Sequence, residues 1–91
     1  MNAKRRKTLQ DIVDRLGKLD ELREEIREQL QDVLDEEQEA LDNIPENLQG
    51  SDRAQQMLEY VDNMQDVIGE LDLMFVANLQ EQLYEVTEAT P

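Results

Sequence analysis

The chain has 91 residues, which is enough for one small domain with a modest apolar core. It has no cysteine and no histidine, so disulfides and ordinary zinc sites are excluded as stabilising features. With 9 basic and 23 acidic residues the net charge is −14, which disfavours direct binding to nucleic acid and to anionic membranes. We therefore expect a single domain over residues 1–91 that gains stability by forming a homodimer.

Four consecutive basic residues, Lys4–Lys7, make the start of the chain its most basic part. We predict a flexible basic arm over residues 1–7. Thr8, followed three residues later by Asp11, resembles a helix capping box, so the first helix is predicted to begin at Thr8. Gly17 inside this helix leaves room for a close neighbour.

An apolar repeat of period 3.5 predicts the first helix over residues 8–43. Its predicted core positions are Leu9, Ile12, Leu16, Leu19, Ile26, Leu30, Val33, Ala40 and Ile44. Further apolar residues widen the stripe on one flank, namely Val13, Leu34 and Leu41. Arg23 and Glu37 interrupt the core series, and they either set the register of a bundle or extend their charged ends to solvent.

Residues 44–51 are the predicted connector between two helices. Pro45 disfavours a helical conformation in the residue before it and lacks an amide donor. Gly50 supplies backbone freedom, and Ser51 is a natural N-cap. These three are the predicted turn and cap residues, and so short a connector makes the two helices antiparallel neighbours.

A second apolar repeat predicts a helix over residues 52–86, followed by a frayed tail over residues 87–91. The apolar positions follow one series from Ala54 to Phe75 and then move one place, to a series that starts at Val76. The chain is thus predicted to be all-α, an antiparallel helical hairpin of the coiled-coil kind.

Apolar side chains cover every side of the second helix where its two series meet. The patch predicted there for self-association or for a partner consists of Leu71, Leu73, Met74, Phe75, Val76 and Leu79. Two helices cannot cover an apolar run on every side, so two hairpins are expected to form a four-helix bundle. A foreign protein is the alternative occupant of this patch.

Acidic residues concentrate on both sides of the connector. Residues 28–63 carry eleven acids and one base, Arg53. The predicted hairpin would carry about one net charge per 2.4 Å there, against about 1.7 Å for duplex DNA. The predicted acidic partner surface comprises Glu28, Asp32, Asp35, Glu36, Glu37, Glu39, Asp42, Glu46, Asp52, Glu59 and Asp62.

This charge favours a basic protein as partner. We expect a non-enzymatic protein-binding module that imitates nucleic acid and inhibits a factor with a basic surface. The alternative is a structural or assembly protein whose role is self-association. The lack of cysteine and of a long apolar run fits a cytoplasmic protein.

Carboxylates are the main candidates for enzyme chemistry in this chain. Five of them match the spacing with which some all-α nucleotide pyrophosphohydrolases hold magnesium: Glu24, Glu25, Glu28, Glu59 and Asp62. The repeat places Ile26 in the core, so the carboxylates beside it point to solvent, whereas a metal site in a bundle needs them inside. We therefore expect no enzyme activity, no metal and no cofactor.

The segment "LDNIPENLQGSDRAQQMLEYVDNMQDVIGELD", residues 41–72, resembles small acidic, mostly uncharacterised proteins of bacteriophages and of prophages in Gram-positive bacteria. The motif that carries the resemblance is "PENLQGS", residues 45–51, a turn and cap between two amphipathic helices. The resemblance covers about a third of the chain and brings no site residues with it. It implies a phage accessory protein that acts in a host cytoplasm, for example as an inhibitor of host defence.

Overall fold

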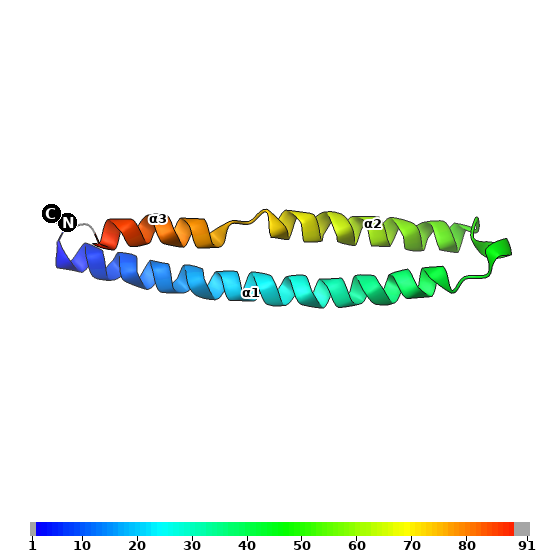
Figure 1. The fold of residues 1–91 in the computed structure, drawn as a ribbon, viewed down its shortest axis with the longest axis horizontal. Helices are drawn as coiled ribbons and strands as arrows, with labels where there is room; N and C mark the ends of the chain where they lie inside the picture. Colours follow the sequence, from blue (N-terminus) through cyan, green and yellow to red (C-terminus); the bar gives the residue numbers. More distant parts are fainter. Residues whose placement is uncertain (1, 89–91) are drawn as a thin grey trace. The chain divides into compact units, whose positions relative to one another are not determined.

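The computed structural model describes residues 2–88, and each regular element in this range is a helix (Figure 1). Helix α1 spans Ala3–Asp42, and the short 3-10 helix η1 spans Glu46–Leu48. Helix α2 spans Asp52–Asp72, and helix α3 spans Val76–Glu88. The predicted all-α class is confirmed.

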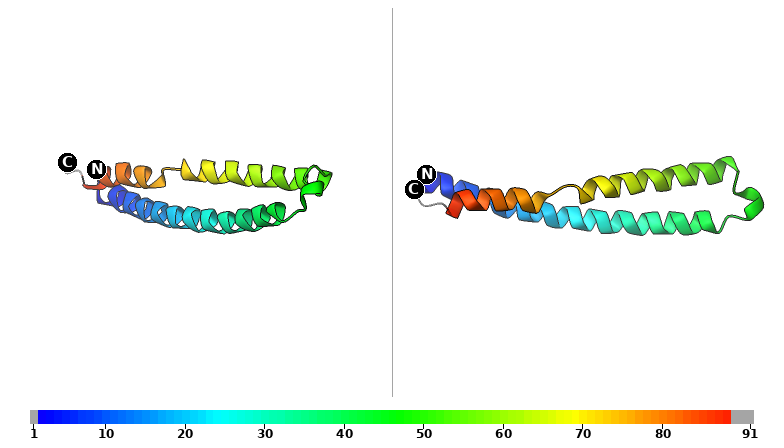
Figure 2. Two further views of the ribbon diagram at one scale, coloured as in Figure 1. Left: turned by 45° about the vertical axis from the view of Figure 1, so that its right-hand side comes forward. Right: turned by 45° about the horizontal axis from the view of Figure 1, so that its top comes forward.

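The helices form two compact units. Unit 1 contains α1 up to Glu24 together with the segment from Met74 onward that includes α3. Unit 2 contains residues Glu25–Leu73, that is, the second part of α1, η1 and α2. Within each unit α1 runs antiparallel to the helix beside it, as Figures 1 and 2 show. The predicted antiparallel helical hairpin is therefore confirmed.

Helix α1 begins at Ala3 because Asn2 caps it. The Asn2 side-chain oxygen accepts a hydrogen bond from the Arg5 amide at 2.8 Å, which satisfies a donor that the first helical turn leaves without a partner. The predicted start at Thr8 is wrong. The Thr8 hydroxyl donates to the Lys4 carbonyl at 3.1 Å, as threonine does inside a helix.

Both predicted chain ends are also corrected. The flexible arm predicted over residues 1–7 is wrong from Ala3 onward, because these residues belong to α1. The fraying predicted over residues 87–91 is wrong for the first two of them, because α3 continues to Glu88 and Thr87 is buried. Residues 1 and 89–91 of the two predicted segments lie outside the described part of the chain.

The connector has the predicted cap. The Ser51 hydroxyl oxygen accepts a hydrogen bond from the Ala54 amide at 3.2 Å and so begins α2. Gln49, which belongs to the "PENLQGS" motif, makes a contact at the other end of the connector: its Nε2 donates to the Ile44 carbonyl at 2.7 Å, just beyond the end of α1. Gly50 does not have a positive φ, so the turn does not require its extra backbone freedom.

The helix predicted over residues 52–86 is wrong in one respect, because it is two helices. Helix α2 ends at Asp72, and residues 73–75 form the non-helical segment between α2 and α3 in Figure 1. An unbroken helix would continue the buried series of α2 at Phe75. Instead Phe75 is 61% exposed and Val76 is 3% exposed. The break shifts the phase by one residue, so that α3 buries Val76 and Thr87, whereas Leu79 and Val86 of its apolar series remain exposed.

The predicted core line of α1 is displaced by one residue. The buried residues are those predicted on the flank, Val13, Leu34 and Leu41. Three predicted core residues remain exposed, Leu19 at 45%, Ile26 at 44% and Val33 at 52%. The apolar stripe of α1 is wider than one antiparallel seam, and a single seam buries only the line that faces the second helix.

Polar contacts contribute to the packing of unit 1. Gln80 Nε2 donates to the Val13 carbonyl at 3.1 Å. A Cβ on Gly17 would lie 3.0 Å from the same nitrogen. The predicted room for a neighbour at Gly17 is therefore confirmed, and the neighbour is Gln80 on α3.

Candidate protein-interaction surfaces

The packing of unit 2 decides which of its side chains remain available for binding. Leu34, Val61 and Ile68 form the core cluster, with Leu30 and Met64 packed against it, and Val61 is only 1% exposed. Because the buried residues follow one line between α1 and α2, the two sides of the helix pair remain open to solvent.

An ion pair joins α1 and α2 within unit 2. Arg27 Nε donates to Asp72 Oδ1 at 2.6 Å, and the Arg27 Nη2 donates to Asp72 Oδ2 at 3.3 Å. Arg27 lies seven residues before the buried Leu34, so it occupies the line of α1 that faces α2. Sequence reasoning missed this pair because it placed the core line one residue away.

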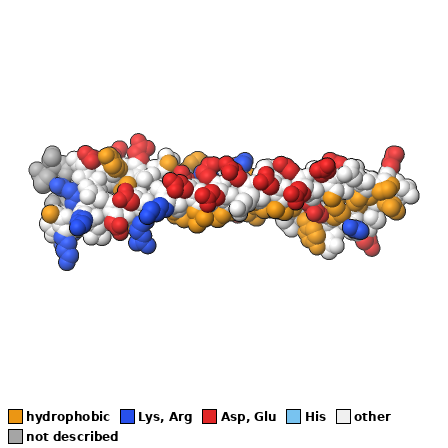
Figure 3. All heavy atoms as spheres, turned by 90° about the horizontal axis from the view of Figure 1, so that it is seen from below, with side chains coloured by type: hydrophobic (Ala, Val, Ile, Leu, Met, Phe, Trp, Pro, Cys, Tyr) orange, Lys and Arg blue, Asp and Glu red, His pale blue; other side chains and the backbone are white. Residues whose placement is uncertain are grey.

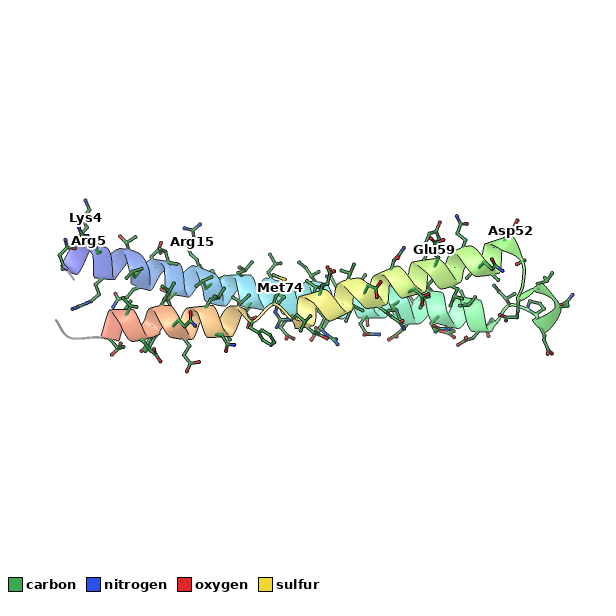
Figure 4. All side chains as sticks on the ribbon, turned by 90° about the horizontal axis from the view of Figure 1, so that it is seen from above. Lys4, Arg5, Arg15, Asp52, Glu59 and Met74 are labelled. Carbon is green, nitrogen blue, oxygen red and sulfur yellow. The ribbon has the colours of Figure 1, made fainter. Side chains whose placement is uncertain are left out.

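All eleven residues of the predicted acidic partner surface lie in unit 2. Ten are exposed, and Glu37 is half-buried. The ion pairs among the described residues use other carboxylates, those of Asp20, Glu24 and Asp72. Figure 4 labels Asp52 and Glu59, which are seven residues apart and so share one face of α2.

Four of these carboxylates define one side of unit 2, which we call the acidic side: Glu28, Asp35, Asp42 and Asp62. The three on α1 recur every seven residues and therefore share a face. Asp35 and Asp42 each accept a hydrogen bond at 2.9 Å from a glutamine four residues earlier. Asp62, the residue after the buried Val61, falls on the same side because α1 and α2 are antiparallel.

The opposite side of unit 2 is apolar, and we call it the apolar side: Ile26, Val33, Ala40, Met57, Tyr60 and Val67. The residues on each helix lie next to its buried line, on the side away from the acidic residues. At the connector, Ala40 and Met57 line one groove, so both helices contribute to this side. In the middle of the face drawn in Figure 3, carboxylates form a row and apolar side chains lie along the edge below it.

Unit 1 carries an open groove on α1 that combines apolar and basic side chains, and we call it the basic groove. Its lining residues are Ile12, Arg15, Leu16, Lys18, Leu19 and Leu22. Leu19 and Leu22 are exposed, and Arg15 points away from α3 in Figure 4. The sequence showed the apolar members of this set, but it placed the core line among them, so this groove was not predicted.

The structure divides the predicted apolar patch between the two units. Leu71 and Leu73 belong to unit 2, and the other four residues belong to unit 1. Leu73, Met74, Phe75 and Leu79 are exposed, and Leu71 is half-buried. Val76 is buried, so it belongs to the packing of unit 1 and is not available as a surface residue.

Arg23 and Glu37 lie on the half-buried line of α1. Arg23 donates to Asp20 at 3.0 Å and to Glu24 at 2.7 Å, both on α1. These hydrogen bonds, first that to Asp20 and then that to Glu24, raise the pKa of the Arg23 guanidinium above its ordinary value. These partners on its own helix fit a side chain that extends its charge along the edge of the seam.

Within residues 2–88 no group of three or more acidic side chains is arranged to hold a metal ion. Glu24, one of the five carboxylates with the magnesium-type spacing, bonds to Arg23 instead. The helices described here are also too short or too polar to span a membrane.

Comparison with known proteins finds no family model, no curated protein and no solved structure that significantly matches this chain.

Proposed function

We propose that the chain is a non-enzymatic protein-binding module and that its acidic partner surface meets a basic surface on another protein. Two observations on the eleven carboxylates support this proposal. Ten of them are exposed, and none of the eleven takes part in an ion pair among the described residues. Unit 2 has 15 acidic and 2 basic residues. Its field therefore attracts a basic partner and weakens as salt is added.

The partner class that best fits this surface is a protein with a basic groove for nucleic acid. A helical surface dense in carboxylates competes with the phosphate backbone for the same lysines and arginines. With the phage resemblance, this suggests an inhibitor that acts on a host factor, for example one of host defence, in the host cytoplasm.

The experiment is capture of a partner from host extract by the immobilised chain, followed by affinity measurements with the purified partner. Asp35→Lys/Asp42→Lys/Asp62→Lys should weaken binding by at least about 10-fold, because it reverses three of the four charges of the acidic side. Glu21→Lys/Glu81→Lys/Glu85→Lys in unit 1 changes the net charge equally and serves as the control. If both variants lost the same amount of affinity, only the net charge would matter, and the proposal that the partner binds a defined acidic surface would be refuted. Duplex DNA should also displace the partner.

Self-association is the second candidate function, and the apolar side of unit 2 supports it. Ile26, Val33, Tyr60 and Val67 are all exposed large apolar residues. Covering such side chains is worth about 1.5–3 kcal/mol each when burial is complete. Two hairpins that cover these side chains with one another would form a four-helix bundle and leave both acidic sides in solvent.

Light scattering on a sizing column tests this pairing. The wild type should elute as a dimer, and Val33→Glu/Val67→Glu should elute as a folded monomer. Leu58→Glu/Gln65→Glu adds the same charge at exposed positions outside the apolar side, and this control should remain a dimer. A wild type that is monomeric at every concentration would exclude self-association.

A further inference from the structure

Helix α1 carries an apolar line that its own chain does not bury. Ile12, Leu19, Ile26, Val33 and Ala40 recur every seven residues. Ile12 is half-buried and the other four are exposed. A strict seven-residue apolar repeat is the pattern of a helix that packs against another helix along its length. The buried line of α1 already serves α2 and α3, so this outer line is free for a further helix.

Between Ile12 and Ala40 the charges beside the outer line change from positive to negative. Arg15 and Glu36 are three heptads apart, and Lys18 and Asp32 are two heptads apart, so each pair holds equivalent places beside the line. The trend extends to the whole helix. Residues 3–24 have seven basic and five acidic residues, net +2, whereas residues 25–42 have one basic and eight acidic residues, net −7.

This polarity identifies the occupant and its direction. A parallel copy would bring two segments of net −7 together, whereas an antiparallel copy brings each net −7 segment against a net +2 segment. A two-fold axis makes the same contact twice, so both halves of each helix are matched at once. A uniformly basic partner would match the second half only.

We infer that a second copy of this chain covers the outer line of α1 in the antiparallel direction. The basic groove of each copy then faces the acidic second half of α1 in the other. This inference deepens the self-association proposed above and depends on it. It assigns Arg15 and Lys18 as the residues that select the orientation, with Asp32 and Glu36 of the other copy as their counterparts.

Charge reversal tests the orientation. Arg15→Glu/Lys18→Glu and Asp32→Lys/Glu36→Lys should each raise the dimer dissociation constant by about 10-fold or more, because attraction becomes repulsion at both ends. The quadruple variant that combines them should return to within about 3-fold of the wild type. Sedimentation equilibrium at low and high salt measures all four constants.

The second double variant is the decisive one. Asp32→Lys/Glu36→Lys lowers the net negative charge of each copy. If only the general repulsion between copies mattered, this variant would form a stronger dimer. The inferred contact predicts a weaker dimer instead. Glu28→Lys/Asp35→Lys makes the same change in net charge away from the outer line and should not weaken the dimer. If the dimer forms but Asp32→Lys/Glu36→Lys strengthens it, the inferred orientation is wrong while self-association stands. A monomeric wild type would contradict both the inferred orientation and self-association.

Because the chain has no cysteine, crosslinking checks the direction independently. Arg15→Cys mixed with Glu36→Cys should join through a short bis-maleimide, and Arg15→Cys alone should not. Circular dichroism of each variant confirms that the helices are retained. Efficient crosslinking of Arg15→Cys alone would overturn the antiparallel pairing.

Discussion

Units 1 and 2 differ most strongly in charge. Unit 1, residues 1–24 and 74–91, has seven basic and eight acidic residues, net −1, whereas unit 2, residues 25–73, has two basic and fifteen acidic residues, net −13. Nearly all of the net charge of −14 therefore lies in unit 2. A basic partner would be attracted by one unit and not by the other.

The two units also differ in what holds them. Unit 2 has the core cluster around Val61 together with the buried Leu41 and Ala54, and the Arg27–Asp72 ion pair reinforces it. Among the described residues of unit 1, the buried apolar side chains are Val13 and Val76. The larger apolar core thus lies in the unit whose carboxylates repel one another. This arrangement allows a dense acidic surface to stay folded, and it predicts that unit 1 opens first.

The largest expected effect comes from charging the two cores. Val61→Asp should destabilise unit 2 by about 3 kcal/mol or more, because it buries an unpaired carboxylate. Val76→Asp should release α3 while α2 keeps its structure. Hydrogen exchange measured by mass spectrometry distinguishes the two outcomes peptide by peptide. Asn63→Asp, an exposed position on α2, is the control and should leave exchange unchanged. Loss of protection in α2 after Val76→Asp would show that the two units unfold together.

Removing the helix caps should have a smaller effect than charging the cores, in a different unit for each cap. Ser51→Ala should cost about 1 kcal/mol in unit 2, and Asn2→Ala should cost a similar amount at the start of α1 in unit 1. Each change removes one side-chain acceptor for a helix amide. Amide exchange at Ala54 and Arg5, followed by NMR, reports each cap separately. Ser51→Asp should preserve the cap, and a loss as large as that of Ser51→Ala would contradict the capping role.

Two glycine substitutions should change stability in opposite directions, one in each unit. Gly69→Ala on α2 should stabilise unit 2 by about 0.5–1 kcal/mol, because nothing lies within 4 Å of the added Cβ. Gly17→Leu should destabilise unit 1 by about 1–3 kcal/mol, because its side chain would displace Gln80 from the Val13 carbonyl. Urea denaturation gives both values. Equal stabilisation by the two substitutions would show that Gln80 does not need the space at Gly17.

The smallest expected effect concerns the ion pair of unit 2. A double-mutant cycle of Arg27→Ala and Asp72→Ala should give a coupling of at most about 1 kcal/mol, because both side chains are partly exposed and salt screens them. The coupling should shrink in 1 M salt. An unchanged coupling at high salt would mean that the alkyl part of Arg27, rather than its charge, stabilises the unit.

Several features of the fold were readable from residue types alone. The helical period, the acidic connector region and the cap at Ser51 follow from local chemistry, because each depends on residues a few positions apart. The same holds for the eleven carboxylates, since acids without cations nearby in a helix are expected to be solvated. Their division into an acidic side and an apolar side needed the positions of both helices.

Other features depend on contacts that sequence spacing does not specify. The apolar stripe of α1 is wide enough for two seams, and the sequence alone placed the core on the outer one, at Ile26 and Val33. Only packing against the second helix decided that Leu34 lies inside. The break at residues 73–75, the approach of Gln80 to Gly17 and the pair of Arg27 with Asp72 arise in the same way.

The sequence by itself therefore determined that this protein is a pair of antiparallel acidic helices with more apolar surface than one seam can bury. The tertiary structure decided which apolar line is used within the chain and which remains exposed. The physical reason is that helix periodicity defines a face about 100° wide, whereas burial requires a specific neighbour across that face.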